Sequence, residues 1–225
     1  KEKYGPLMKA FLGRILDGAD RYLLDADSAT YGVLIGPSGL NSTMMTEFSA
    51  DSYCGSLVKK VKNTDDAMLQ GLPLGKYVAY LGYMSTPEVT GELFDNLVNG
   101  PVSQELVALG EDGKSVQDYL ATCRKNLMAT KSVAAGLHAP TGMIGQESLI
   151  QAVEIFNGDA KTLSQTQHAM AEKSEKFSNL MQAGNGVSVK VTLKPAAKTI
   201  EGVALDQTSM DFSGEPNDPQ GAQQQ

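Results

Sequence analysis

The chain has no tryptophan, only two histidines and only two cysteines among its 225 residues. A Ser-His-acid site or a zinc site would therefore depend on His138 or His168, and neither belongs to a group of Cys, Asp and Glu residues with metal-ligand spacing. We expect His168 to be a solvated surface residue, because it lies off the apolar side of its helix. His138, beside Pro140, is expected to be a loop residue satisfied by the backbone. The sequence assigns no catalytic, cofactor-binding or metal-binding residue.

Cys54 and Cys123 allow one disulfide at most. Each lies on the apolar side of a predicted helix, so we interpret them as two buried thiols that behave as small hydrophobic residues. A bridge between two packed helices is the alternative. No Cys-x-x-Cys motif is present, which disfavours thiol redox catalysis.

Long hydrophobic runs and concentrated positive charge are also lacking. No apolar stretch approaches the roughly 20 residues that a membrane-spanning helix needs. The net charge is -7, and Lys59 to Lys62 form the one local basic cluster, which we interpret as the solvated end of a helix. Nucleic acid is therefore disfavoured as a partner. Because the chain begins at Lys1 rather than Met, we expect a processed or trimmed product, from which a signal peptide could have been removed.

The composition that is present is typical of a folded globular protein. Hydrophobic residues make up 41% of the chain and charged residues 20%. A chain of this length buries roughly 70% of its unfolded surface when it is compact. Composition therefore predicts a folded chain with a core.

The first part of the chain reads as a helix, a hairpin, a helix and a strand. Strands at 29–36 and 40–49 flank the turn Gly36-Pro37-Ser38-Gly39, a helix runs from Ser52 to about Asn63, and residues 76–84 form a third strand. Before the hairpin, the helical spacing of apolar residues predicts an amphipathic helix that packs on another part of the protein. These residues are Leu7, Phe11, Leu12, Ile15 and Leu16.

The remainder of the chain reads as a helical insert followed by a second set of strands. Thr86 is a plausible helix cap and Pro87 suits the first turn of the helix. After the insert we expect a hairpin at 132–140 and 148–156, a long helix, an alternating strand at 187–194 and a last strand at 202–212.

The order β-β-α-β thus occurs twice. It predicts an α+β fold, mainly antiparallel sheet with helices packed on it, because neighbouring strands joined by short turns run antiparallel. We expect a single domain at 1–214 with halves at about 1–85 and 131–214, joined by a helical insert at 86–130. The two halves would share one sheet or two packed sheets. Residues 215–225 are expected to be a flexible tail or linker.

The segment around Gly113-Lys114-Ser115 imitates a phosphate-binding loop. The motif needs a second glycine five positions before Gly113, where this chain has Ala108, and Glu111 and Asp112 would repel an anion. We interpret the segment as the first turn of a helix that spans 115–129.

Other candidate sites are equally incomplete. Ser38 lacks the spacing and the strand-to-helix context of a nucleophile elbow. The acidic pairs lack the glycine and distal glutamate of a calcium loop, and we interpret them as solvated. These pairs are Asp25/Asp27, Asp65/Asp66 and Glu111/Asp112.

Three stretches together resemble a group of uncharacterised bacterial exported proteins. They are "LDADSATYGVLIGPSGLNSTMMTEF", "LQGLPLGKYVAYLGYM" and the C-terminal "VSVKVTLKPAAKTIEGVALDQTSMDFSGEPNDPQGAQQQ". The likeness covers most of residues 15–220, with a departure at polar Asn41, Ser42 and Thr43. It implies periplasmic or secreted localisation and a longer parent protein, and it brings no catalytic residues.

The leading hypothesis is a non-enzymatic binding or structural module of the cell envelope, with a protein or an envelope component as partner. A carrier of an apolar small molecule or lipid is the alternative, suggested by ten methionines and by Tyr77, Tyr80 and Tyr83, which could line a groove under the sheet. A hydrolase with a site assembled from distant residues is the third hypothesis.

Overall fold

The computed structural model describes residues 4–37, 39–62, 68–75, 77–138, 152–181, 187–200 and 203–213. Ser38, Asp65, Asp66 and the predicted tail at 215–225 lie outside the described residues. The described part holds six helices and seven strands, in the order α1 (Gly5–Asp25), β1 (Ala26–Gly36), β2 (Gly39–Phe48), α2 (Tyr53–Lys60), β3 (Tyr77–Met84), α3 (Pro87–Val98), α4 (Pro101–Ala108), α5 (Glu111–Ala129), β4 (Thr130–His138), β5 (Ala152–Gly158), α6 (Ala160–Met181), β6 (Ser188–Ile200) and β7 (Val203–Ser213).

The fold class is α+β with antiparallel sheets, as predicted. The β-β-α-β order occurs in both halves, with α3, α4 and α5 as the insert between them. The number of sheets differs from the expectation: the described strands form three separate sheets, β1–β2, β3–β4–β5 and β6–β7. The strands of the two halves pair in the middle sheet, where β3 of the first half is hydrogen-bonded to β4 of the second.

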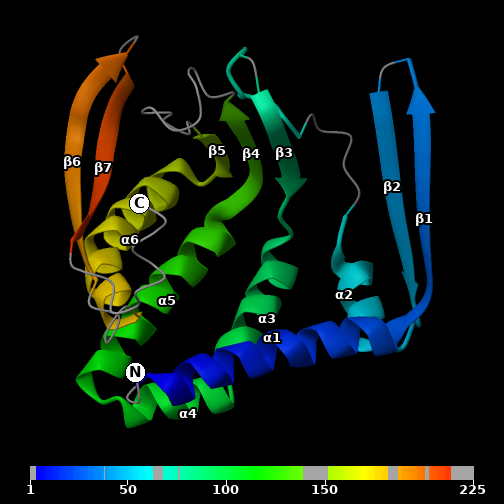
Figure 1. Ribbon diagram of the computed structural model, residues 1–225, viewed down its shortest axis with the longest axis horizontal. Coiled ribbons are helices and arrows are strands. Elements are labelled where there is room, and N and C mark those ends of the chain that lie inside the picture. The colour runs from blue at the N-terminus through cyan, green and yellow to red at the C-terminus, as the bar shows by residue number, and fades with distance from the viewer. Residues whose placement is uncertain are drawn as a thin grey trace, which may run out of the picture.

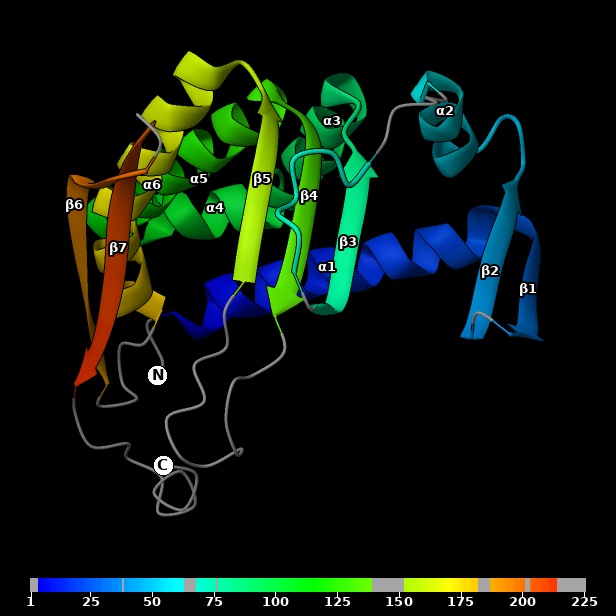
Figure 2. The same ribbon diagram turned by 90° about the horizontal axis from the view of Figure 1, so that it is seen from above.

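The three sheets stand in a row along the length of α1. Figure 1 shows α1 and α4 below, the other helices above them, and the strands rising from this helical base. Seen from above in Figure 2, the β1–β2 hairpin lies at one end of the row and the β6–β7 hairpin at the other. Among the described residues, no helix has the length and hydropathy of a membrane span.

The best-buried cluster lies among the helices. Leu7 of α1, Val102 and Leu106 of α4 and Val116 of α5 are each at most 2% exposed. Tyr119 of α5 stacks on Phe177 of α6 beside them, with ring centroids 4.4 Å apart. The core therefore binds α1, α4, α5 and α6 into one base.

Only the first part of α1 belongs to this core. The predicted amphipathic helix is present, but Leu12, Ile15 and Leu16 are 55%, 57% and 65% exposed. The spacing of these residues identified the helix correctly, but their expected packing is wrong. The second half of α1 extends past α4 toward the β1–β2 hairpin (Figure 1).

The starts of α2 and α3 follow their local sequence signals to different degrees. Ser52 caps α2, since its Oγ accepts a hydrogen bond from the Gly55 N–H at 3.0 Å. Pro87 occupies the first turn of α3, but the Thr86 side chain makes no capping hydrogen bond. Lys59 and Lys60 end α2 as exposed residues, as predicted.

The β6–β7 hairpin is attached to α6 by hydrogen bonds between side chains of α6 and the backbone of β6. The Asn179 side chain donates to the Val189 carbonyl at 2.8 Å and accepts from the Val189 N–H at 2.7 Å, while Glu175 accepts from the Val191 N–H at 2.9 Å. Val189 is 4% exposed, whereas Lys190 is exposed. The predicted half-buried strand at 187–194 is therefore confirmed.

Gly113 lies inside α5, which begins at Glu111 rather than at 115 as expected. A Cβ on Gly113 would overlap the carbonyl oxygen of Leu106 in α4. Gly113, which belongs to the segment that resembles a phosphate-binding loop, therefore allows α4 and α5 to approach closely.

This close approach predicts opposite effects for two Gly→Ala exchanges within helices. Gly113→Ala should lower the free energy of unfolding by about 1–3 kcal/mol, because backbone atoms of α4 must move. Gly18→Ala in α1, where an added Cβ meets nothing within 4 Å, should raise it by up to about 1 kcal/mol through helix propensity. Urea unfolding followed by circular dichroism measures both, and a Gly113→Ala protein as stable as the parent would contradict the packing.

Candidate functional site

Three strands of the first half carry little charge: β3 has none, and β1 and β2 have one charged residue each, Asp27 and Glu47, at the end of the hairpin away from its turn. Residues 28–46, which span most of β1 and β2, and residues 77–87, which include all of β3, contain no Asp, Glu, Lys, Arg or His. The β6–β7 hairpin, in contrast, carries Lys190, Lys194, Lys198, Asp206 and Asp211. Strands at sheet edges usually carry such charges, which prevent pairing with other chains. The uncharged residues 28–46 and 77–87 are therefore the candidate interaction surface.

The register of the β1–β2 hairpin places four large apolar residues on one side. Tyr31 pairs with Met44, and the next positions on the same side are the Val33–Ser42 pair and Ile35. We call Tyr31, Val33, Ile35 and Met44 the apolar hairpin face. Thr30 and Thr43 belong to the opposite face, together with Leu34 and Met45.

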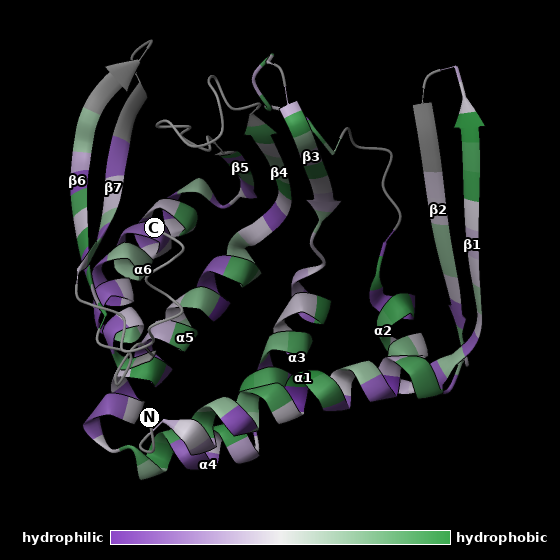
Figure 3. Cartoon of the chain, viewed as in Figure 1, coloured by the Kyte–Doolittle hydropathy of each residue, from purple (hydrophilic) through white to green (hydrophobic). Residues whose placement is uncertain are grey.

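The apolar hairpin face is in contact with water. Tyr31 is 67% exposed, Ile35 79% and Met44 63%. Figure 3 shows that β1 is hydrophobic toward its turn, while β7 contains hydrophilic residues. Full burial of a large apolar side chain stabilises a fold by about 1.5–3 kcal/mol. The exposed residues of this face do not provide that stabilisation.

The hairpin is joined firmly to the base at its lower end only. The Tyr22 hydroxyl of α1 hydrogen-bonds Thr46 Oγ1 at 2.8 Å, and the Tyr22 ring meets Phe48 edge-on with centroids 5.1 Å apart. Thr46 and Phe48 share their side of β2 with Met44. Tyr22 therefore covers the base of the apolar hairpin face and leaves the upper part uncovered.

The acidic pair Asp25/Asp27 serves this anchorage. Asp25 accepts from the Cys54 N–H at 2.8 Å, and this bond holds the pKa of its carboxyl below the usual value. Asp27 accepts from the Ser49 hydroxyl at 2.6 Å. These carboxylates fix the hairpin and the start of α2, so the expectation that the pair is only solvated is wrong.

The uncharged strand β3 forms one edge of the middle sheet. Val78, Tyr80 and Leu81 are 60%, 66% and 60% exposed. Tyr80 and Tyr83 lie on opposite faces, because side chains alternate along a strand and the register is regular between them. The Tyr77 hydroxyl donates to the Pro73 carbonyl at 2.6 Å. The expectation that the three tyrosines line one groove is therefore wrong.

His168 has a partner that no spacing in the sequence indicates. Its Nε2 atom contacts Asp206 Oδ2 across 38 positions of the chain, and Asp206 Oδ1 accepts from the Ala196 N–H at 2.8 Å. These hydrogen bonds, first that of His168, lower the pKa of the Asp206 carboxyl. The prediction that His168 is only a solvated surface residue is therefore wrong, because its side chain links α6 to the β6–β7 hairpin.

This pair borders a groove of about 340 Å³ between α6 and β7, lined also by Tyr119, Met210 and Thr208. A hydrolase would need a hydroxyl or thiol bonded to the imidazole. Among the described residues no such bond to His168 is found. His138 ends β4, and its side chain lies outside the described residues.

The two cysteines and Asp112 also show no arrangement typical of a reaction centre in the described structure. Cys54 on α2 and Cys123 on α5 are separate, half-buried thiols, and burial raises the pKa of each. Asp112 accepts a hydrogen bond from the Tyr4 hydroxyl at 3.0 Å. In the described ranges no group of His, Cys, Asp and Glu is arranged to hold a metal ion.

Another groove, of about 500 Å³, lies between α1, α2 and α3. Each of its two arginines makes one contact across the groove, although the Nε atom of Arg14 is buried without a hydrogen-bond partner among the described residues. Arg14 donates to the Asn99 carbonyl at 3.2 Å, and the Arg21 guanidinium lies 4.9 Å from the centroid of the Tyr53 ring. The groove joins helices and offers no prepared reaction centre.

Sequence reasoning missed two features of the structure, the uncovered apolar hairpin face and the His168–Asp206 pair. The uncharged run at 28–46 was a readable signal for the first. For the second there was no local signal. Comparison of the chain with protein-family models, curated proteins and solved structures found no match.

The lowered pKa of Asp206 predicts a pH-dependent attachment of the β6–β7 hairpin. A carboxyl with a depressed pKa stabilises the fold above its unfolded pKa, 3.8, and loses this effect as the pH falls toward the folded value. Asp206→Asn should therefore have a lower melting temperature than the parent at about pH 5, and the difference should shrink as the pH falls below 3.8. Thermal unfolding measures both, with Asp211→Asn on the same strand as charge-matched control. A gap that stays constant with pH would refute the role of this carboxylate.

Proposed function

We propose that the chain is a non-enzymatic binding module of the bacterial cell envelope and that its partner is another polypeptide. The observation that carries the proposal is the uncharged edge strand β3 with large apolar side chains in water. Envelope localisation rests on the resemblance of three stretches to exported bacterial proteins.

Strand addition is the binding mode that fits β3. This strand pairs with β4 on one side, and no described strand pairs with its other side. A second polypeptide in extended conformation can take up the free N–H and C=O groups of such an edge, while its alternate side chains provide specificity. Val78, Tyr80 and Leu81 offer apolar contacts, and no charge on β3 opposes them. The partner segment is therefore expected to be extended, apolar at alternate positions and uncharged.

The carrier hypothesis has less support. The groove of about 590 Å³ beside α1 includes Lys9, Arg14, Asp17 and Glu105 in its lining, a composition that suits an apolar ligand poorly. Since Tyr80 and Tyr83 face opposite ways, the tyrosines do not form a common wall for a ligand. A polypeptide on the strand edge needs no such cavity.

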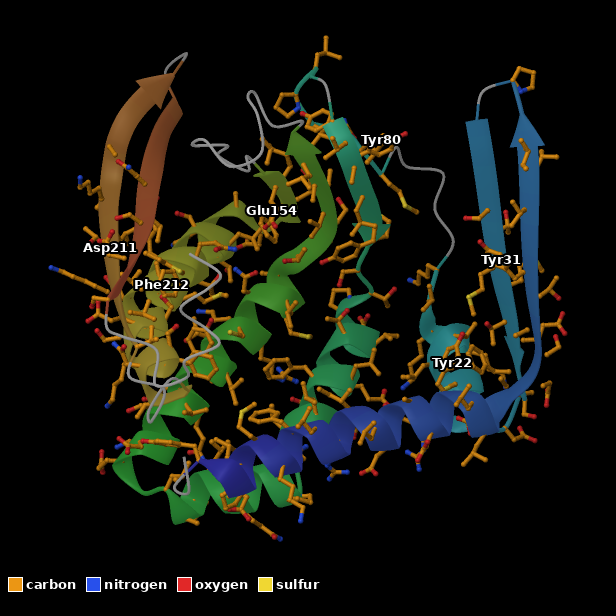
Figure 4. All side chains as sticks on the ribbon, in the orientation of Figure 1. Tyr22, Tyr31, Tyr80, Glu154, Asp211 and Phe212 are labelled. Carbon is orange, nitrogen blue, oxygen red and sulfur yellow. The ribbon has the colours of Figure 1, made fainter. Side chains whose placement is uncertain are left out.

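Site-specific photo-crosslinking in the cells that produce the protein tests the proposal. A photoreactive phenylalanine replaces Tyr80, which is 66% exposed, or Phe212 of β7, which is 67% exposed. The two aromatic residues, labelled in Figure 4, lie on different sheets and are matched in exposure. The Tyr80 position should give one defined adduct and the Phe212 position none, because the charged hairpin resists strand pairing.

Mass spectrometry of the Tyr80 adduct should identify a peptide with alternating apolar residues. Equal adducts at both positions, or no adduct at Tyr80, would remove the proposed binding site. Crosslinking to a lipid at Tyr80 would instead favour the carrier hypothesis.

Localisation is tested separately by fractionating cells that express the complete gene product. The protein should be released with periplasmic markers by osmotic shock or sediment with the envelope. Recovery with a cytoplasmic marker enzyme would contradict export, while the crosslinking result would still decide the binding site.

A further inference from the structure

The hairpin formed by β1 and β2 has its own binding surface, separate from the edge of β3. We propose that it is a self-association site, at which the apolar hairpin face of one copy packs on that of a second copy. The interface would be a two-layer sandwich of two hairpins related by a two-fold axis. It would bury Tyr31, Val33, Ile35 and Met44 of both copies.

Exposure along the hairpin identifies the part that a partner must cover. Near the base, Thr46 is bonded to Tyr22 and partly shielded. Farther out, Met44, Tyr31 and Ile35 are 63%, 67% and 79% exposed. The hairpin stands at one end of the molecule in both ribbon views (Figures 1 and 2), so this surface is accessible to a second molecule.

Charge favours a second copy at this place. Each copy carries a net charge of -7, so two copies repel one another over most of their surface. The uncharged residues 28–46 are an exception, as are residues 77–87 around β3. β1 has 11 residues and spans about 35 Å, several times the Debye length of about 8 Å at physiological salt. Contact through the upper hairpins therefore keeps the acidic bodies beyond effective repulsion.

The composition of the apolar hairpin face is also self-complementary. In a two-fold interface the same patch occurs on both sides, so each apolar residue meets an apolar region of the other copy. Two hairpin faces pack about 10 Å apart in such a sandwich, the spacing that aliphatic and aromatic side chains fill. Ser42 is the polar member of this face, and its small side chain obstructs nothing.

The β6–β7 hairpin of the same chain provides a comparison. Its inner side packs on α6 through Val189, and its strands bear lysines and aspartates. The upper part of the β1–β2 hairpin, residues 28–46, has neither a covering helix nor charged residues. Similar geometry with opposite surface chemistry indicates that β1–β2 meets a partner.

The area predicts a dimer of moderate strength. A two-stranded face of this length has a footprint on the order of 350 Å² per copy, against roughly 800 Å² per partner in a standard interface. Exposed Leu23 and Leu24, at 70% and 85%, extend the apolar surface at the foot of the hairpin. We therefore expect a reversible equilibrium with a dissociation constant in the micromolar range.

Sedimentation equilibrium of the full chain at about 1 to 200 µM tests the inference. The parent should shift from monomer to dimer with concentration. Ile35→Lys places a charge on the apolar hairpin face and should weaken dimerisation at least about tenfold. Thr43→Lys adds the same charge to the opposite face and should change it less than about threefold. Both positions are solvent-exposed, so circular dichroism spectra should match that of the parent.

A cysteine pair supplies an independent measurement. With Cys54 and Cys123 replaced by serine, Val33→Cys should form a disulfide-linked dimer under mild oxidation, and Thr43→Cys should not. A parent protein that stays monomeric over the whole range would overturn the inference. So would equal weakening by both lysine variants.

A lipid surface is the competing occupant. Vesicles of phosphatidylglycerol and phosphatidylethanolamine should not sediment the parent. If they do, and Ile35→Lys abolishes it while the protein is monomeric in solution, the hairpin binds lipid and the dimer is refuted. The Tyr80 crosslink is also measured in the Ile35→Lys variant. This comparison separates a failure of the proposed dimer from a failure of the proposed partner site on β3.

Discussion

The packing of α1, α4 and α5 around Leu7, Val102, Leu106 and Val116 is the interaction on which the rest of the structure depends. The first part of α1 packs into this helical base. The second half of α1 extends beyond it and leads to the β1–β2 hairpin. Gly113 permits this packing, because any larger residue would displace the backbone of α4. The sheets are supported by the base more than they support it, and few of their side chains are buried.

This division between a helical core and outlying strands determines where the molecule can bind. The β6–β7 hairpin is covered by α6 and tied to it by Asn179, Glu175 and the His168–Asp206 pair. The upper part of the β1–β2 hairpin and the outer edge of β3 lack such cover in the described structure, and both are free of charged residues. Because edge strands without charge pair readily with other chains, these two places are where partners are expected.

Much of the fold could be predicted because its signals are local. The turn at Gly36-Pro37, the cap at Ser52 and the alternation around Val189 each determine structure within a few residues. The candidate site was less accessible to sequence reasoning. The three tyrosines suggested a groove, yet the pleat of β3 sends Tyr80 and Tyr83 to opposite faces. The solvation expected for His168 failed because Asp206 approaches it from a distant strand.

The sequence by itself determined the order of helices and strands, the antiparallel pairing of neighbouring strands, and the absence of charge from residues 28–46 and 77–87. Periodicity, turn chemistry and composition act over short distances, so these properties need no knowledge of the rest of the chain. Tertiary structure alone decided that the strands divide into three sheets and that Leu7 is buried while Leu16 is exposed. Burial depends on which residues from distant parts of the chain pack together. An apolar pattern in the sequence indicates only which face of a helix or strand is able to pack against another element.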